Sequence, residues 1–260
     1  MRMRLDAQLL RLAWNVRGAQ LGGCTPAAAY RTVRKGYDLE DAAREAIPKV
    51  LGSTQLSYER LVTLYQQVSY LEKNKLQGAL VECGVWRGGA AGVMALASLA
   101  EGNGRRMLHL FDSFQGMPEP DLARDGAQAF RLAGRRGDGS LVSTGVNVAH
   151  ADDVKSLIID RLGYPAAAVV VHSGWFQETL PAARHEIGPI ALLRVDADWY
   201  ESTLVVLDQL FDLVVPRGVV VIDDYGAFDG CRRATDEFLA RRAPHLYLHH
   251  IDYTGRYLIK

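Results

Sequence analysis

The sequence has no excess of charge of either sign, few cysteines and no long apolar run. Its 260 residues include 30 Lys and Arg against 30 Asp and Glu, so it lacks the basic excess by which proteins displace counterions from nucleic acid phosphates. No apolar stretch approaches the roughly 18 residues of a membrane-spanning helix. Polar residues such as Asp6 and Arg11 interrupt the apolar start of the chain, which argues against a signal peptide. We therefore expect a cytoplasmic protein that binds neither nucleic acid nor a membrane.

Internal repeats and paired cysteines are absent as well. Cys24, Cys83 and Cys231 are scattered and form no CxxC pair, so they are expected to be free thiols in a reducing compartment. Hydrophobic residues make up 48% of the chain and charged residues 23%, which is typical of a globular protein rather than a disordered one. The length suits one large α/β domain, alone or with a small cap.

Two regions of different pattern divide the chain. Residues 1–75 show helical periodicity and no convincing strand, and Ser57 is a candidate N-cap for a helix with one apolar face. We expect this region to form a helical cap or lid. Residues 76–260 alternate helical segments with short β-branched runs, which predicts parallel strands buried on both faces. The runs are Ala79–Cys83, Met107–Phe111, Ala168–Val171, Ile190–Val195 and Val219–Ile222.

The chain ends in a predicted hairpin. His245–Ile251 and Arg256–Ile259 are strand-like and flank a tight turn at residues 252–255, so the last strand should run antiparallel to its neighbour. Pro216–Gly218 is predicted to be the turn before the preceding strand. The pattern as a whole predicts a doubly wound, mostly parallel α/β sheet. Residues 113–150 fit it poorly, and we expect them to form a mobile lid rather than a passive surface loop.

A glycine-rich turn follows the first predicted strand, where residues 82–89 read ECGVWRGG. Gly84 permits a sharp turn, and Gly88 allows a close approach of helix and ligand. Trp86 stands where a dinucleotide fingerprint has its second glycine, and its side chain would block a pyrophosphate. Asp112 ends the second strand and is placed either to bind a ribose diol or to cap a helix. A nucleoside bound without a phosphate cradle points to S-adenosylmethionine.

Acidic side chains follow two further strands, in RVDADWYE (194–201) and VIDDY (221–225). Because the tips of neighbouring parallel strands lie together, their carboxylates should repel one another and hold raised pKa values. A divalent cation would relieve this repulsion, and oxygen ligands suit Mg²⁺; capping of the following helices is the alternative. We predict Asp196, Asp223 and Asp224 as the metal ligands. Either Asp196 or Asp198 would be the general base, and Asp198 is preferred because a strong ligand is a poor base.

Several motifs resemble the macrocin-type O-methyltransferases, which act on sugars of macrolide and aminocoumarin antibiotics. They are VECGVWRGGAAG, FDSFQGMP, GWFQETLP, RVDADWYEST, VPRGVVVIDDYG and GCRRATDEF, and the resemblance covers residues 54 to about 240. It implies a seven-stranded, Rossmann-like methyltransferase fold that uses S-adenosylmethionine and Mg²⁺. Within the family, the chain is most similar to the aminocoumarin branch, which implies a glycosylated small-molecule acceptor methylated at the 4-hydroxyl of noviose.

The same resemblance implies which residues bind the cofactor. Three groups of residues would hold, in this order, the amino-acid end, the ribose and the adenine of the cofactor. These residues are Glu82, Gly84 and Gly88, then Asp112 and Ser113, then Gly174 and Trp175. Thr54 would close over the cofactor. VDADWY also resembles the metal-binding segment of caffeoyl-CoA O-methyltransferases. There a lysine follows, whereas Trp199 interrupts the pattern here, so a carboxylate must replace the lysine base.

Other interpretations stay open on the sequence alone. Methyl transfer to a phenol or catechol would use the same machinery, a nicotinamide-dependent oxidoreductase would share the fold, and a non-enzymatic module could bind a nucleoside for regulation. A homodimer is the candidate assembly. Four aromatic residues of the cap are expected to form its core rather than to stack on an acceptor; they are Trp14, Tyr58, Tyr65 and Tyr70.

Overall fold

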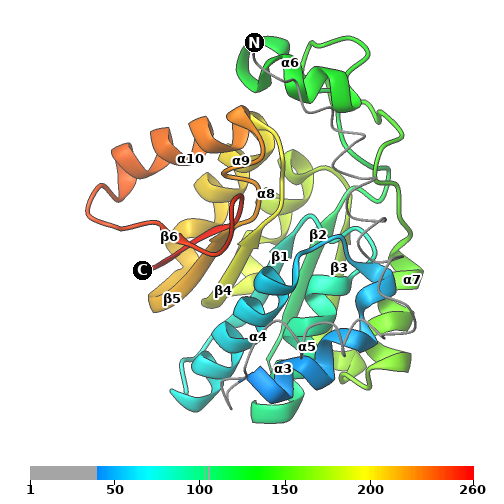
Figure 1. The fold of residues 1–260 in the computed structure, drawn as a ribbon, viewed down its shortest axis with the longest axis vertical. Helices are drawn as coiled ribbons and strands as arrows, with labels where there is room; N and C mark the ends of the chain where they lie inside the picture. Colours follow the sequence, from blue (N-terminus) through cyan, green and yellow to red (C-terminus); the bar gives the residue numbers. More distant parts are fainter. Residues whose placement is uncertain (1–39, 103, 105) are drawn as a thin grey trace, which may run out of the picture.

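The computed structural model describes residues 40–102, 104 and 106–260. They form a seven-stranded sheet with helices on both faces (Figure 1). The strands are β1 (Ala79–Cys83), β2 (Leu108–Asp112), β3 (Val169–Ser173), β4 (Ile190–Val195), β5 (Val214–Ile222), β6 (His249–His250) and β7 (Arg256–Ile259). The helices are α3 (Asp41–Ala46), α4 (Tyr58–Lys73), α5 (Gly89–Gly102), α6 (Leu122–Ala133), α7 (Ala151–Lys155), α8 (Phe176–Ile187), α9 (Tyr200–Leu210) and α10 (Asp229–Arg242). Shorter helical turns are η2 (Ile47–Lys49), η3 (Leu51–Ser53), η4 (Ser156–Arg161), η5 (Ala166–Ala168) and η6 (Phe211–Leu213).

The strand order is β3-β2-β1-β4-β5-β7-β6. Strands β1 to β5 pair in parallel, whereas β7 pairs antiparallel with both β5 and β6. This topology confirms the predicted doubly wound α/β fold with an antiparallel last strand. The chain order reverses beside β1, whose neighbours are β2 and β4, and ligands of such sheets bind at that reversal, beyond the carboxyl ends of the strands.

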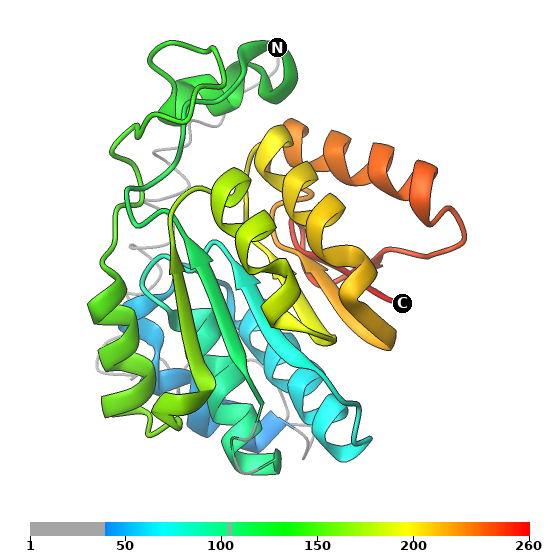
Figure 2. The ribbon, with the colours of Figure 1, turned by 180° about the vertical axis from the view of Figure 1, so that it is seen from behind.

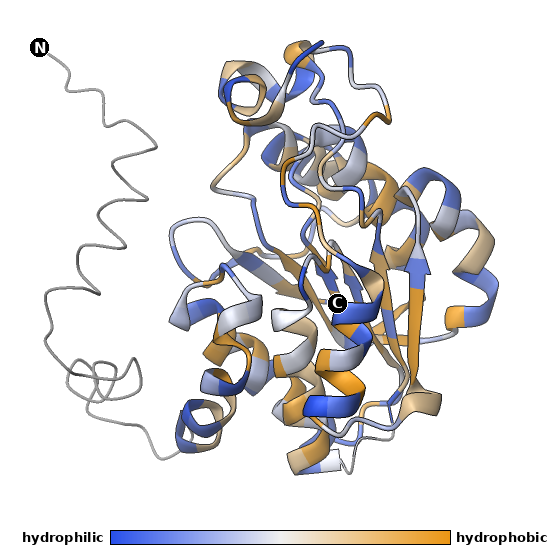
Figure 3. Ribbon diagram, turned by 90° about the vertical axis from the view of Figure 1, so that its right-hand side faces the viewer, coloured by the Kyte–Doolittle hydropathy of each residue, from blue (hydrophilic) through white to orange (hydrophobic). Residues whose placement is uncertain are grey.

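Side chains alternate between the two faces of the sheet and build two cores. Leu80 and Leu108 are fully buried against α4 and α5, whereas Val81 and Leu193 are fully buried against α8, α9 and α10. Figure 2 shows α8 and α9 in front of the sheet, on the face opposite α4 and α5. Hydropathy colouring shows apolar strands at the centre and mostly polar outer faces on the helices (Figure 3). Burial on both faces explains why these strands read as continuous apolar runs.

Helix α4 begins where the sequence predicts. The Ser57 side chain accepts a hydrogen bond from the Arg60 amide at 3.2 Å, which caps the helix. The apolar face of α4 packs on α5 and shares a core with β1 and β2. Tyr58 and Tyr65 are buried in this part of the chain, Tyr70 is exposed, and Trp14 lies outside the described residues. The division of the chain at residue 75 stays a prediction.

The segment 113–150 contains ordered structure that its irregular sequence does not reveal. It carries α6 and two isolated β-bridges, one of which joins Pro118 to Ser143. The buried Glu119 carboxylate accepts hydrogen bonds from three consecutive amides, beginning with that of Arg135. Figure 1 shows α6 at the top of the molecule, beyond the sheet. Whether the segment moves as a lid stays a prediction.

Two local predictions differ from the structure. Of the predicted strand 245–251, only His249–His250 pairs with β7, and residues 245–248 form a turn and an irregular segment. Residues 216–218 do not precede β5 but lie within it, at an irregularity where Ile190 pairs with Val214 and Leu192 with Val219. The Arg217 amide donates to the carbonyl of Lys260, the residue directly after β7, so the end of the chain pairs with the irregular part of β5. None of the helices described here is long and apolar enough to cross a membrane.

Candidate functional site

Two neighbouring cavities open beyond the carboxyl ends of the strands. The smaller one, about 100 Å³, is lined by the turns after β1, β2, β3 and β4, and we call it the glycine-turn cavity. The larger one, about 290 Å³, contains most of the acidic side chains, and we call it the acidic cavity. Trp86, Met117, Asn147, Asp196 and Asp198 line both. A ligand in one cavity would therefore lie against residues that also face the other.

The glycine-turn cavity gathers five of the predicted cofactor residues. They are Gly84, Asp112, Ser113, Gly174 and Trp175. Thr54 and Glu82 line the acidic cavity instead. Gly88 lines neither cavity. A Cβ at this position would meet Val154 of α7 at 3.1 Å, so the glycine allows α7 to pack closely. All of these cofactor assignments stay predictions.

Gly84 lets the tips of β1 and β4 approach one another. Its backbone has φ +93°, and a Cβ at this position would lie only 1.8 Å from the carbonyl oxygen of Asp196. The Asp196 amide in turn donates to the Cys83 carbonyl at 2.8 Å. Only glycine satisfies both the positive φ and the close approach, and the turn thereby brings Asp196 to the edge of both cavities.

Asp112 shapes the backbone around the glycine-turn cavity. One carboxylate oxygen accepts from the Val85 and Trp86 amides at 2.8 Å each, and the other accepts from the Phe114 amide at 2.7 Å. Burial raises the pKa of Asp112, and these backbone hydrogen bonds oppose that shift. The carboxylate thus holds the turns after β1 and β2 together, so the backbone it caps belongs to two turns rather than to a helix.

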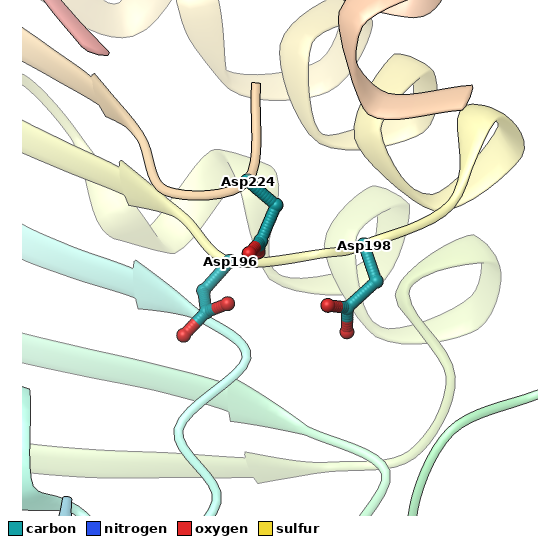
Figure 4. Close-up of side chains that lie close together, drawn as sticks. All are labelled: Asp196, Asp198 and Asp224. Atoms are coloured by element: carbon teal, nitrogen blue, oxygen red, sulfur yellow. The ribbon is translucent and has the colours of Figure 1, made fainter. Parts of the chain in front are cut away.

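Three carboxylates meet in the acidic cavity. Asp196, Asp198 and Asp224 each offer an oxygen, and these oxygens lie within 4.8 Å of one another (Figure 4). Burial raises the pKa of Asp198 and of Asp224 well above the ordinary value, and the neighbouring carboxylates raise both further. The buried Asp224 Oδ2 has no hydrogen-bond partner among the described residues. Such a cluster is the arrangement that a divalent cation would stabilise.

Asp223 lies apart from this trio. Its Oδ1 is 2.7 Å from Arg194 Nη2, and its Oδ2 is 2.5 Å from Arg60 Nη1. Asp223 lines the acidic cavity together with Asp224, but both of its carboxylate oxygens are paired with arginines. The sequence predicts Asp223 as a metal ligand, whereas the structure brings Asp198 into the third position.

Arg194, which links three carboxylates beside the cavities, is a candidate site residue that sequence reasoning missed. Its guanidinium is 2% exposed and lies 2.6 Å from Glu82, 2.9 Å from Asp196 and 2.7 Å from Asp223. Burial raises the pKa of Glu82 to about 8, since Arg194 offsets only part of the desolvation. A single arginine inside the otherwise apolar run Ile190–Val195 was the available signal, because a charge in a doubly buried strand must have ionic partners.

The histidines lie away from this chemistry. His172 stacks on Phe111 with ring centroids 4.0 Å apart, and its Nε2 is 3.2 Å from Nδ1 of His109. Burial lowers the pKa of His109 to about 4. His172 is therefore part of the sheet packing. Cys83 and Cys231 are buried free thiols, and Cys24 lies outside the described residues.

Comparison with known proteins gives a consistent set of relatives. The family model described as macrocin O-methyltransferase (TylF) matches residues 27–260. The chain is 32% identical to an 8-demethyl-8-(2,3-dimethoxy-α-L-rhamnosyl)-tetracenomycin-C 4′-O-methyltransferase of Streptomyces olivaceus, over 83% of this chain and 81% of that protein. It is 34% identical to the demethyldecarbamoylnovobiocin O-methyltransferase of Streptomyces niveus, over 72% of this chain and 68% of that protein.

Solved structures agree with the sequence relatives. The O-methyltransferase NovP superposes with a TM-score of 0.67 at 33% identity, over 80% of this chain and 82% of that one. An O-methyltransferase from Bacillus cereus in complex with SAH superposes with a TM-score of 0.54 at 16% identity, over 88% of this chain and 94% of that one. The second likeness shows the shared fold alone.

Proposed function

This chain belongs to the macrocin O-methyltransferase (TylF) family, and from this premise we propose that it methylates a sugar hydroxyl of an antibiotic glycoside. It is an S-adenosylmethionine-dependent O-methyltransferase, which decides against the nicotinamide-dependent and non-enzymatic alternatives. The observation that carries the proposal is the pair of adjoining cavities, which share Asp196 and Asp198. A donor in the first cavity and an acceptor hydroxyl in the second would meet at these carboxylates.

The glycine-turn cavity is the proposed place of the cofactor. The half-buried carboxylate of Asp112 and the backbone of its turns would supply acceptors for a ribose and leave no cradle for a pyrophosphate beside Trp86. Glu82 lines the adjoining cavity, and its buried Oε2 has no hydrogen-bond partner among the described residues. That oxygen suits the ammonium group at the amino-acid end of S-adenosylmethionine.

The acidic trio fits a magnesium ion. Three mutually repelling carboxylates and the unpartnered buried oxygen of Asp224 are hard oxygen donors that a divalent cation would satisfy. In this proposal Asp196 and Asp224 hold the ion, and Asp198 faces it. When bound, Mg²⁺ supplies Lewis-acid chemistry that lowers the pKa of a coordinated hydroxyl.

The chain's own residues would then orient the acceptor and take its proton. Asp198 is the proposed general base, because burial and Asp196 raise the pKa of its carboxyl and so make it a better proton acceptor. Arg194 keeps Asp196 oriented through the contact at 2.9 Å. Trp86 and Met117 line both cavities and would separate the reacting groups from bulk water.

The charges of the acidic cavity favour a finished glycoside over a nucleotide-activated sugar. Its lining includes five acidic side chains and two arginines, and both arginines are already engaged by those acids or by Asp252. A diphosphate would be repelled there and would find no unpaired cation among the lining residues. Leu132, Phe228 and Tyr253 add apolar surface that suits an aglycone. Following the novobiocin-type relative, we propose the 4-hydroxyl of noviose as the acceptor.

The test is a panel of acceptors incubated with the enzyme, S-adenosylmethionine and Mg²⁺, followed by mass spectrometry. We expect a mass gain of one methyl on a demethylated aminocoumarin glycoside, none on the corresponding nucleotide sugar, and none on free catechol. The control reactions contain EDTA, which should abolish turnover, and excess Mg²⁺, which should restore it. Methylation of catechol but not of the glycoside would show that the acceptor is a phenol rather than a sugar. Full activity in EDTA would show that the reaction needs no metal ion.

A further inference from the structure

Trp199 is the residue of the acidic motif that the proposed chemistry leaves unexplained. It follows Asp198 directly and is the N-cap residue of α9, yet it is 2% exposed and is not among the residues that line either cavity. Its indole packs with Met117, Ala129 and Ala133, all from the segment 113–150. Its Nε1–H donates to the Pro118 carbonyl at 2.9 Å. The residue next to the proposed base therefore packs against the segment 113–150 and donates a hydrogen bond to it.

A second contact between the same parts is made by a buried carboxylate. Asp125 of α6 is 3% exposed, and its Oδ1 accepts from the Tyr200 amide at 2.6 Å, while its Oδ2 accepts from the Asp121 amide at 2.8 Å. Gly230 at the start of α10 leaves room for it, since a Cβ there would lie 2.0 Å from Asp125 Oδ1. The segment therefore supplies the acceptor for the first amide of α9.

Asp198 directly precedes these two contacts and has an uncommon backbone conformation. It has φ +57°, in the left-handed region that costs a non-glycine residue roughly 1 kcal/mol or more. Such a conformation persists only when the surroundings determine it. Here the next two residues are fixed by the segment, one through its indole and the other through its amide.

We infer that Trp199 and Asp125 are positioning residues, through which the docked segment 113–150 holds the Asp198 carboxylate towards Asp196 and Asp224. The inference rests on the proposed function in taking Asp198 as the proton acceptor. Met117 links Trp199 to the ligand-binding cavities, because it packs in the same core as Trp199 and also lines both cavities. An acceptor that presses on the segment would act on the position of Asp198.

Two conservative variants test the inference. Trp199→Phe keeps an aromatic ring but removes the Nε1–H donor and part of the buried ring, and Asp125→Asn keeps the shape and one of the two acceptors. For each, kcat is measured per S-adenosylmethionine-binding site with the demethylated aminocoumarin glycoside, together with the Kd for S-adenosylmethionine. We expect kcat to fall at least tenfold while this Kd stays within threefold of wild type. A purely structural role would lower the number of binding sites and leave kcat per site unchanged.

Hydrogen exchange gives a readout that does not depend on turnover. In both variants, amide exchange should rise together in peptides covering 113–150 and 196–203. The matched control is Glu201→Gln, which removes the exposed ion pair with Arg124 between the same helices (2.7 Å) and should change neither kcat nor exchange. Wild-type kcat in both variants would overturn the inference, as would faster exchange confined to 113–150. If the wild type methylates no glycoside, the proposed function fails, and the exchange result still decides the coupling.

Discussion

The two cavities are built from different materials. The glycine-turn cavity is lined by the turns after β1 to β4 and by the half-buried carboxylate of Asp112, which accepts from backbone amides within 27 residues of it. The acidic cavity is formed by side-chain ion pairs that join distant parts of the chain, such as Arg60 with Asp223 across 163 residues. The first arrangement is local and rigid, whereas the second depends on charge balance. We therefore expect changes in the first to affect cofactor affinity and changes in the second to affect catalysis and folding.

The largest expected effect is on catalysis in the acidic cavity. Asp196→Ala removes a carboxylate of the trio and should lower kcat by a factor on the order of 10³ or more, as losses of groups that stabilise the transition state do. Because Asp196 contributes only part of the lining of the glycine-turn cavity, affinity for S-adenosylmethionine should change less than threefold. Stopped assays of methyl transfer and calorimetric titration with the cofactor measure the two quantities. A large loss of cofactor affinity with unchanged kcat would reverse the comparison.

The next effect concerns stability. Arg194→Met leaves Glu82 and Asp223 buried with fewer partners and should lower the free energy of unfolding by about 4 kcal/mol, measured by urea denaturation. Its control is Arg242→Met, which breaks an exposed pair with Asp212 and should cost less than about 1 kcal/mol. Equal losses in the two variants would show that the buried network does not depend on its arginine.

Much of the scaffold follows from local pattern. The β-branched runs predict five parallel strands, of which β1, β2 and β4 are almost wholly buried, whereas β3 at the edge of the sheet is only half-buried. The turn 252–255 predicts the hairpin, and Asp252 accepts from the Thr254 and Gly255 amides there. The meeting of acidic residues after β4 and β5 follows equally, since the Asp223 amide bonds to the Val195 carbonyl and so aligns the two strand tips.

What the sequence could not predict depends on long-range pairing. Nothing in VIDDY says which aspartate joins the carboxylate trio; Asp223 is instead paired with Arg60 on α4, and Asp224 lies with Asp196 and Asp198. Strand β6 is short because only His249 and His250 pair with the start of β7, and the order within 113–150 depends on Glu119 and Trp199. Each of these choices depends on a tertiary partner, near in the chain for β6 and distant for Asp223, so no local periodicity encodes it.

A histidine pair outside both cavities separates the pH dependence of the scaffold from that of the acidic cavity. Burial lowers the pKa of His109 from 6.5 to about 4, so the folded state binds fewer protons than the unfolded state between these values. Stability is therefore full above pH 6.5 and lost as the pH falls towards 4, by about 2 kcal/mol between pH 7 and pH 5. In His109→Phe this contribution to the change in the free energy of unfolding between pH 7 and pH 5 should vanish. Replacement of the exposed His185 in His185→Gln should leave it unchanged. Urea titrations at the two pH values measure it, and an unchanged slope in His109→Phe would assign the acid lability to the carboxylates instead.

The smallest effect sharpens the comparison from the other side. Asp112→Asn keeps the shape of the side chain but replaces one of its two acceptor oxygens by an NH₂ donor. The remaining oxygen can accept either from the Val85 and Trp86 amides or from the Phe114 amide, but not from both sides. Affinity for S-adenosylmethionine should fall about tenfold, the equivalent of one hydrogen bond to a charged group, and kcat at saturating cofactor should change little. Asp138→Asn, which also alters a carboxylate that accepts a backbone amide but lies outside both cavities, should change neither. A fall in kcat at full saturation would mean that the glycine-turn cavity also positions the acidic one, through the close approach of Gly84 to Asp196.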